Sequence, residues 1–478
     1  MDGLTAPPVA ASGAERLARF ALGLRPEEIP AEVVHAAKLH VLDTLGCGLA
    51  ASALGVASQG RTLALAEGGR GQASAIGAGE LLPAGAAAFA NGMLCHGLDF
   101  DGTHADSVCH VSTVVVPAAL AAGEAAGASG QELLAAVVAA NEIVARLGMA
   151  ASGAFHTRGF HATSVCGVFG AAAAASRLGG LASDAAVSAL GLAGSFASGL
   201  FAFLEDGVAT KPLHAGLAAQ GGIRAAQLAA LGAEGPPSVL EARFGLFRAF
   251  AGTDPAALAE QLTDLGARWE TPRIAFKAYP ACHYAHGALG AGTLLLAEHA
   301  PDPRAISEIE VTVPPGPAVA LVLEPAAEKA APRTPYEAKF SLPYSLAALL
   351  VHGRVGIDSY AAETIADERV LELAALVSYR VEDFVSADRA FPGEVRLTLA
   401  DGSVLQARLD FQQGAPENPL SEAAVVAKFR ASAGLALDPD RVEALAAAVL
   451  RLDELEHGAA ALATLRLAHS SPSAGAAS

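Results

Sequence analysis

The strongest constraint on the fold of this chain is a long run of small apolar residues. Between Glu15 and Gly266, alanine, leucine and valine recur at helical spacing, interrupted by glycine pairs and proline. The sequence is 53% hydrophobic but only 5% aromatic, so most of its apolar volume lies in small side chains. Because small side chains let helix backbones approach closely, the pattern predicts a tightly packed helical domain. It includes helices over Val33–Leu49 and Gly130–Met149.

The pattern changes near Trp269. Two segments beyond it, Ile306–Pro314 and Glu394–Leu399, alternate apolar and polar residues as strands do. Between them, helices are expected over Tyr344–Val351 and Asp367–Val377. This mixture predicts a smaller α+β unit.

The predicted protein is therefore mainly α, with two domains. A chain of 478 residues is long enough for two domains and a large core. The sequence is helical again from Leu420 onward, so both ends of the chain are expected to build one body. We predict a large all-helical domain from residues 1–268 and 412–478, and a smaller inserted α+β domain over 269–411.

Composition narrows the class of protein. Mean hydropathy is +0.40, but charge, glycine or proline breaks the apolar stretches before a membrane span of about 18 residues is reached. The first residues show no secretory signal, and five scattered cysteines suit a reducing compartment, so we expect a soluble cytoplasmic protein. A net charge of −18 without a basic stripe argues against nucleic acid as a partner. The last nine residues, rich in serine and alanine, are expected to be disordered.

One polar stretch, from Asn91 to Thr113, stands out against these apolar surroundings. Polar groups are costly to bury unless they are paired or used, so such a cluster is a candidate site of chemistry. Its titratable and hydroxyl side chains are Asp99, Asp101, Thr103, His104, Asp106 and His110.

Several interpretations of this cluster are open. A calcium loop starting at Asp99 would need a glutamate at its twelfth position, where His110 stands. Zinc could take His104, His110 and an aspartate, but no HExxH or CxxC motif accompanies them. A structural role, with an aspartate capping a helix, is a further alternative. Acid–base catalysis by an aspartate and a histidine is the interpretation we favour.

Three other segments carry polar groups in apolar surroundings. In Gly159–Ser164, Thr163 or Ser164 is expected to cap a following helix over Val165–Leu178, which would place His161 at its positive end. In Lys211–Gly216, the lysine either extends to solvent or pairs with an anion. The segment Lys277–His286 lies between the predicted domains, where pockets commonly form.

Together these motifs resemble the MmgE/PrpD family, which includes 2-methylcitrate dehydratase, cis-aconitate decarboxylase and iminodisuccinate epimerase. The motifs follow one another over nearly the whole chain: KLHVLDTLG, NG, LDFDGTH, GFHATS, KPLHAG, KAYPACHYAH, FSLPYSLA, ENPL and KF. The resemblance implies a helical domain with an inserted α+β domain, a homodimer, and a metal-free, cofactor-free active site between the domains.

The resemblance also implies roles for single residues. We assign catalysis to Asp99, His110, His161 and Lys211. We assign substrate binding to Thr103, His104, Lys277 and Tyr344.

This sequence departs from the family pattern in its polar loop. Gly102 stands where the family usually has a second acidic residue after the phenylalanine, and Val111 stands where proline often follows the histidine. The segment from Thr103 to His110 is also shorter than in methylcitrate dehydratases. These differences leave the substrate open.

The functional hypothesis is a cofactor-free lyase that acts on a small di- or tricarboxylic acid, with elimination of water as the leading reaction. Decarboxylation of a cis-aconitate-like acid and epimerisation of an iminodisuccinate-like acid are the alternatives. A helical binding or scaffold protein that uses the same pocket without turnover is the non-enzymatic alternative.

Overall fold

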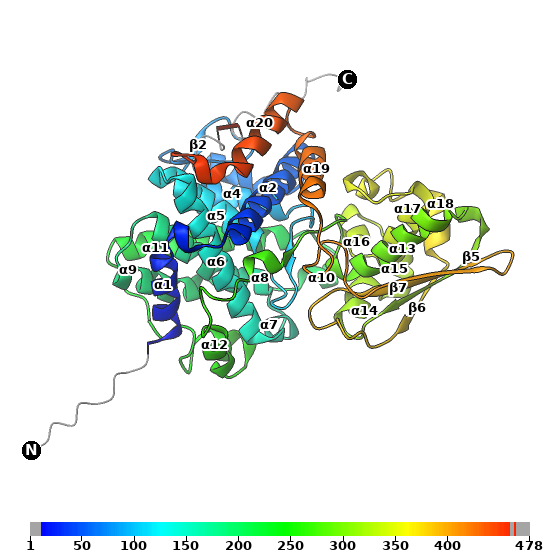
Figure 1. Ribbon diagram of the computed structural model, residues 1–478, viewed down its shortest axis with the longest axis horizontal. Helices are drawn as coiled ribbons and strands as arrows, with labels where there is room; N and C mark the ends of the chain where they lie inside the picture. Colours follow the sequence, from blue (N-terminus) through cyan, green and yellow to red (C-terminus); the bar gives the residue numbers. More distant parts are fainter. Residues whose placement is uncertain (1–10, 459–462, 465–478) are drawn as a thin grey trace, which may run out of the picture.

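The computed structural model describes residues 11–458 and 463–464 and shows two domains side by side (Figure 1). The expected absence of a secretory signal concerns residues that lie partly outside the described ones. The expected disorder of the last nine residues concerns a segment that lies wholly outside them. Two hydrophobic cores underlie the domains: one collects residues between 14 and 274 and between 426 and 452, the other residues between 279 and 397. The mainly α fold class is confirmed, while the domain boundaries stay a prediction.

The larger domain is built of helices from both parts of the chain. They are α1 (Gly13–Gly23), α2 (Ala31–Ala53), α3 (Gln59–Glu67), α4 (Ala84–His96), α5 (Ser112–Ala126), α6 (Gly130–Ala151), α7 (Ala154–Thr157), α8 (Ala162–Leu178), α9 (Ser183–Ala193), α10 (Phe203–Asp206), α11 (Lys211–Ala230), α12 (Ala256–Gln261), α19 (Glu422–Ala433) and α20 (Pro439–Leu450). The last two return from the smaller domain, and α19 packs on α2 (Figure 1).

Small residues set the spacing of these helices, as the sequence predicts. Helix α11 packs against both α8 and α4. At the crossing with α4, a Cβ added to Gly92 would lie 2.9 Å from the Cα of Gly216. Both positions therefore have to be glycine for the two backbones to come this close.

Helix α6 runs through the core of the larger domain. It is long and apolar enough to cross a membrane, but 94% of its most apolar stretch is buried inside the protein, as in a core helix. Its buried Glu142 accepts hydrogen bonds from the backbone N–H groups of Glu270 and Thr271, at 2.8–2.9 Å. Arg146 donates to the Arg268 carbonyl. The polar groups of α6 thus anchor the segment that leads into the smaller domain.

The smaller domain packs helices on a four-stranded sheet. Its helices are α13 (His286–His299), α14 (Pro317–Val322), α15 (Ala326–Ala330), α16 (Pro335–Lys339), α17 (Leu342–His352) and α18 (Glu368–Ala374). Its strands are β5 (Ile306–Val313), β6 (Val377–Val381), β7 (Gly393–Leu399) and β8 (Val404–Leu409).

The strand order of this sheet is β6-β5-β7-β8. Strands β5 and β6 are parallel, and the other pairs are antiparallel. Strand β7 turns into β8 through Asp401-Gly402, where Gly402 has a φ of +82°. The predicted helix over Asp367–Val377 is too long at its end, because α18 ends at Ala374 and Val377 begins β6.

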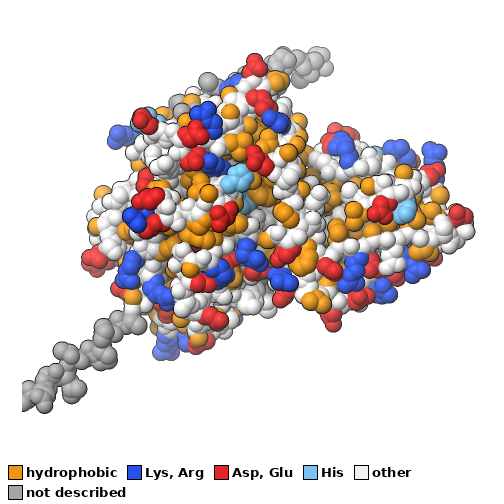
Figure 2. All heavy atoms as spheres, in the orientation of Figure 1, with side chains coloured by type: hydrophobic (Ala, Val, Ile, Leu, Met, Phe, Trp, Pro, Cys, Tyr) orange, Lys and Arg blue, Asp and Glu red, His pale blue; other side chains and the backbone are white. Residues whose placement is uncertain are grey.

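Short strand pairs complete the larger domain. Strand β1 (Ala73–Ser74) pairs with β2 (Leu81–Leu82), and β3 (Thr103–His104) pairs with β4 (Ile274–Ala275), both antiparallel. The second pair ties the polar loop after α4 to the segment that enters the smaller domain. Charged side chains of both signs are interspersed over the face shown in Figure 2.

Candidate active site

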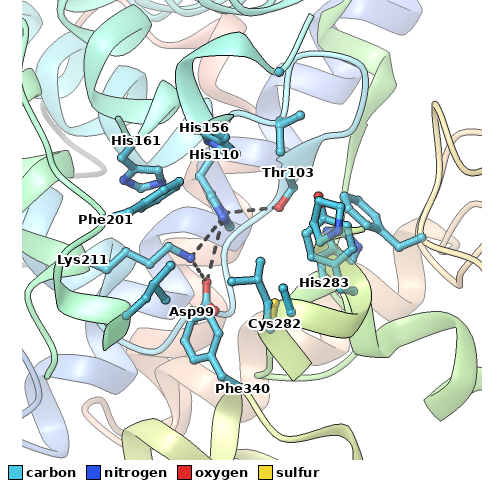
Figure 3. Close-up of a pocket in the computed structure, with 18 of the residues that line it drawn as sticks. Asp99, Thr103, His110, His156, His161, Phe201, Lys211, Cys282, His283 and Phe340 are labelled. Carbon is cyan, nitrogen blue, oxygen red and sulfur yellow. Dashed lines mark hydrogen bonds and ion pairs between the residues drawn. The ribbon is translucent and has the colours of Figure 1, made fainter. Parts of the chain in front are cut away.

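A cavity of about 480 Å³ lies between the two domains. Its polar lining comes from the loop after α4, from α7, from the starts of α8 and α11, and from the segment before α13 (Figure 3). These polar residues are Asp99, Thr103, His110, His156, Thr157, His161, Lys211, Lys277, Cys282, His283 and Tyr284. Aromatic rings and leucines from both domains form the rest of the wall, among them Phe201, Phe203, Leu204, Leu321, Phe340 and Phe391.

Asp99 is the anionic centre of the cavity. Its Oδ1 accepts hydrogen bonds from Lys211 Nζ at 2.8 Å and from Lys277 Nζ at 2.9 Å. Burial acts to raise the pKa of Asp99, but the two ammonium groups lower it more, so the carboxyl is held well below its usual range. Asp99 therefore stays ionised and draws two cations to the cavity surface.

Asp101 lies behind this surface, fully buried, and orients two histidines. Its carboxylate is 2.9 Å from His96 Nδ1 and 3.1 Å from His110 Nδ1. Burial acts to raise the pKa of Asp101, but the two imidazoles lower it well below its usual value. An ionised carboxylate only accepts hydrogen bonds, so each of the two histidines directs an Nδ1–H toward Asp101.

His110 is the histidine that faces the cavity. Its Nε2 lies 3.3 Å from Lys211 Nζ, and its Nδ1 also lies 3.3 Å from Thr103 Oγ1 (Figure 3). Burial and the Lys211 charge lower the pKa of His110 to about 3. The imidazole is therefore neutral near pH 7 and presents a lone pair to the ammonium of Lys211.

His161 forms the adjoining wall at the start of α8. Its ring centroid lies 6.2 Å from that of His110 and 5.4 Å from that of Phe201. Its Nδ1 lies 3.2 Å from Nδ1 of His214 on α11. Burial and Lys211 lower the pKa of His161 well below its usual value, so this imidazole is neutral as well.

The smaller domain contributes the opposite wall. His283 stacks on Phe391, with 4.3 Å between ring centroids, and Cys282 lies beside it on the cavity surface. Burial raises the pKa of the Cys282 thiol, which makes it a poor nucleophile.

Six of the eight predicted site residues line this cavity: Asp99, Thr103, His110, His161, Lys211 and Lys277. His104 and Tyr344 do not. His104 points to Glu270 Oε2 at 3.1 Å and to Ser107 Oγ at 3.0 Å. The Tyr344 hydroxyl donates to the Ser359 carbonyl at 2.6 Å within the core of the smaller domain.

The predicted cap of α8 is wrong. Neither Thr163 nor Ser164 caps the helix, whose N-cap is His161. Thr163 Oγ1 instead accepts the backbone N–H of His110 at 2.9 Å, and Ser164 Oγ donates to the His214 carbonyl at 3.1 Å. Both hydroxyls thus fix site residues.

The sequence-based site assignment left out several polar residues in or behind the cavity lining, although Asp101 belongs to the polar cluster singled out above: His96, Asp101, His156, Thr157, His214, Cys282, His283 and Tyr284. Asp101 and His96 both lie within the polar stretch after Asn91. Their spacing of five residues was a signal that could have suggested an Asp–His pair. His214 lies three residues after Lys211, which places both on one face of a helix. His156 offered no such signal.

Gly102 is explained by the β3–β4 pairing. A Cβ at position 102 would lie 2.6 Å from the Ala275 carbonyl oxygen. A second acidic residue therefore does not fit in this backbone, which accounts for the departure from the family pattern.

The residues that could hold a metal fall into separate groups. Ring nitrogens of His96, His110 and His161 lie within 4.8 Å of one another, and His96 and His110 form a similar group with Asp99 and Asp101. The ammonium of Lys211 lies against this second group and takes the place of a cation there. His104 belongs to a different group, with Asp106 and Glu270, so it does not share a zinc site with His110 in this arrangement.

Comparison with known proteins identifies the family of this chain. The profile of the MmgE/PrpD N-terminal domain matches residues 15–259, and that of the MmgE/PrpD C-terminal domain matches residues 279–454. The chain belongs to the MmgE/PrpD family.

Several similar proteins are cis-aconitate decarboxylases. The human enzyme is 33% identical over 448 residues, which cover 91% of this chain and 90% of the enzyme. The mouse enzyme is 30% identical, with 92% and 91% covered, and an Aspergillus terreus enzyme is 26% identical, with 92% and 93% covered. This MmgE/PrpD protein is therefore similar over more than nine-tenths of its length to enzymes that act on a small carboxylic acid.

Proposed function

We propose that this MmgE/PrpD protein is a lyase that decarboxylates cis-aconitate or a closely similar unsaturated tricarboxylic acid. The observation that carries the proposal is the convergence of Lys211 and Lys277 on one oxygen of Asp99, at 2.8 and 2.9 Å, on the cavity surface. Two ammonium groups this close can hold a substrate carboxylate by charge-assisted hydrogen bonds. The relatives support the choice of acid.

The reaction needs an electron sink and a proton. The bond between carbon and the leaving carboxyl breaks, its electron pair moves through the C=C bond to a neighbouring carbon, and carbon dioxide departs. One proton is then added to that carbon, so charge and atoms balance. The negative charge that develops spreads onto a remaining carboxylate, where Lys211 and Lys277 stabilise it.

In this proposal, His110 delivers the proton. Its Nε2 faces Lys211 Nζ at 3.3 Å, and Asp101 fixes the proton on Nδ1. Three substrate carboxylates raise the pKa of a nearby imidazole, so binding favours proton transfer from solvent to Nε2, while Lys211 keeps its positive charge. His161, with its ring 6.2 Å from His110, can serve the other side of the substrate.

The apolar wall suits the loss of a charged group. Phe201 packs against His161, and the ring of Phe340 lies 5.6 Å from Lys211 Nζ. A carboxylate placed against such rings is poorly solvated, whereas the neutral carbon dioxide that it becomes is not disfavoured there.

Dehydration, the leading reaction in the sequence-based hypothesis, stays the second candidate. The His110–Asp101 pair favours it, because an imidazole oriented by a carboxylate can also protonate a departing hydroxyl.

The test is product analysis with three acids: cis-aconitate, the hydroxy acid citrate, and an imino-dicarboxylic acid. With cis-aconitate we expect release of one carbon dioxide per molecule consumed, and an NMR spectrum with one carboxyl carbon fewer. Water loss from citrate without carbon dioxide would replace the proposal by dehydration. Binding of these acids without any turnover would favour the non-enzymatic alternative.

The proposal includes no metal and no cofactor. We expect activity to survive extended EDTA treatment, since the Lys211 ammonium supplies the charge that a metal would bring. Loss of activity that one metal restores would contradict this part of the proposal.

A further inference from the structure

Three successive backbone carbonyls after α4 are held by three lysines. Helix α4 ends at His96, so the carbonyls of Leu98, Asp99 and Phe100 lie beyond the helix and take no part in its hydrogen bonds. The carbonyl oxygen of Leu98 accepts from Lys339 Nζ at 2.5 Å, that of Asp99 from Lys277 Nζ at 2.7 Å, and that of Phe100 from Lys428 Nζ at 2.7 Å. The three lysines come from three separate segments of the chain.

This turn requires support. Asp99 has a φ of +53°, in the left-handed region that residues other than glycine rarely adopt. The peptide groups on either side of Asp99 decide where two carboxylates point, since Asp99 faces the cavity lysines and Asp101 faces the histidines. A small rotation of one peptide group would move both carboxylates from their partners.

Lys428 reaches the turn from α19. Its Nζ also pairs with the buried Asp43 of α2 at 2.8 Å and lies 3.8 Å from the centre of the Phe100 ring. One ammonium group thus holds the carbonyl and the ring of the same residue.

Lys339 reaches the turn from the smaller domain. It ends α16, is 8% exposed, and has its Nζ 5.8 Å from the centre of the Tyr360 ring. Burial lowers the pKa of Lys339 to about 8. An ammonium this deeply placed is costly unless its hydrogen bonds are used, which fits a fixed partner at Leu98.

We infer that Lys339 and Lys428 are positioning residues, which hold the Asp99 turn in its left-handed conformation so that Asp99 and Asp101 reach their partners. The inference rests on the proposed function for its activity readout. Lys277 and Lys339 belong to the segments beyond Ile274, so the turn is complete only when the smaller domain is docked against the larger one.

The test compares Lys339→Met and Lys428→Met with Lys339→Arg and Lys428→Arg. Methionine keeps the length of the side chain and removes the donor, while arginine keeps a charged donor. Lys38→Met is the matched control, because Lys38 also ties α2 to the C-terminal part of the chain, through Asp453 at 2.5 Å, but does not contact the turn.

With cis-aconitate, we expect each methionine variant to lower kcat by about 10- to 100-fold, the effect of misplacing a catalytic group by about 1 Å. KM should change less than about threefold, because Lys211 and Lys277 remain to hold carboxylates. The arginine variants should recover most of kcat, and the control should keep it. A kcat within about twofold of wild type in both folded methionine variants would overturn the inference.

A second readout does not depend on turnover. Since Asp101 fixes the ring protons of His96 and His110, ¹⁵N NMR of labelled protein reports whether the turn is in place. We expect the ring-nitrogen shifts of these histidines to change in the methionine variants but not in Lys38→Met. Unchanged shifts would overturn the inference. If the wild-type protein turns over none of the acids but the methionine variants still show changed shifts, the positioning inference is supported and the proposed function fails. If methionine variants do not fold, the arginine variants carry both measurements, and wild-type shifts with wild-type kcat are then expected.

Discussion

The loop between α4 and α5 carries two histidines, six positions apart, that end in different surroundings. His104 has both ring nitrogens occupied, by Ser107 and Glu270. His110 has its Nδ1 oriented by Asp101 and turns its Nε2 to Lys211 and the cavity. A side chain whose hydrogen-bonding groups are all used within the protein has none left for a substrate. The same residue type thus supports the loop at position 104 and is available for chemistry at position 110.

The largest expected effect comes from replacing His110. His110→Gln should lower kcat on the true substrate by roughly 10²–10⁴-fold, the usual contribution of a general acid or base. The melting temperature should stay close to wild type, because a polar side chain of similar size replaces the ring. Steady-state kinetics and thermal unfolding on the same preparation decide this. Wild-type kcat in the variant would remove the distinction between the two histidines.

Lys211→Ala should have the next largest effect. It removes one of the two cations that hold a substrate carboxylate, so kcat/KM should fall roughly 10- to 150-fold. This corresponds to a loss of about 1.5–3 kcal/mol of transition-state stabilisation. Lys38→Ala, which removes a lysine from an ion pair away from the cavity, is the control and should keep wild-type kcat/KM. Equal kcat/KM in both variants would show that the cavity cations do not bind substrate.

His104→Gln should reverse the pattern seen at His110. Glutamine cannot reach both Ser107 and Glu270, and a buried polar group left unpaired costs about 1–3 kcal/mol of stability. Turnover per folded molecule should stay near wild type. Denaturant unfolding with activity normalised to the folded fraction measures both. A stable variant with a large loss of kcat would place His104 in the active site after all.

The smallest expected effect is a pH dependence of stability, to which buried histidines in both the cavity and the core contribute. The pKa values of His110 and of His40 on α2 are lowered by burial, to about 3 and about 4. A histidine that stays neutral when folded but binds a proton near its usual pKa when unfolded destabilises the fold as pH falls. Stability should thus be full above about pH 6.5 and decline toward pH 4.

A comparison of His40 and His110 variants distinguishes this effect on stability from an effect on catalysis. Each change to glutamine should reduce the loss of melting temperature between pH 7 and pH 5, but only His110→Gln should affect turnover. His40 serves as the comparison because it stacks on Phe276 and bonds to the Thr271 carbonyl, away from the cavity lining. Melting temperatures that do not depend on pH in this range would contradict the neutral state of these rings.

The sequence was sufficient for the helices and for much of the cavity lining. Helical spacing of small residues predicts α2 and α6 within a few positions, and the ordered motifs bring Asp99, His161 and Lys277 together although they are far apart in the chain. Spacing within one motif was a poorer guide. His104 and His110 share a motif, but the pairing of β3 with β4 turns His104 toward Glu270.

Other features depend on contacts that sequence spacing does not reveal. Tyr344 belongs to a family motif, but its hydroxyl is satisfied by Ser359 inside the smaller domain. The support of the Asp99 turn by Lys339 and Lys428 joins segments that lie more than 200 residues from it. No local pattern of hydrophobicity or charge encodes such contacts.

The most direct test of the account is the position of a bound acid in a crystal structure. The saturated acid tricarballylate lacks the double bond through which the electron pair moves, so it should bind without reacting. We expect one carboxylate within hydrogen-bond distance of Lys211 Nζ and Lys277 Nζ, and a carbon of the acid facing His110 Nε2. An acid bound at His104 and Glu270, or outside the cavity, would contradict the account.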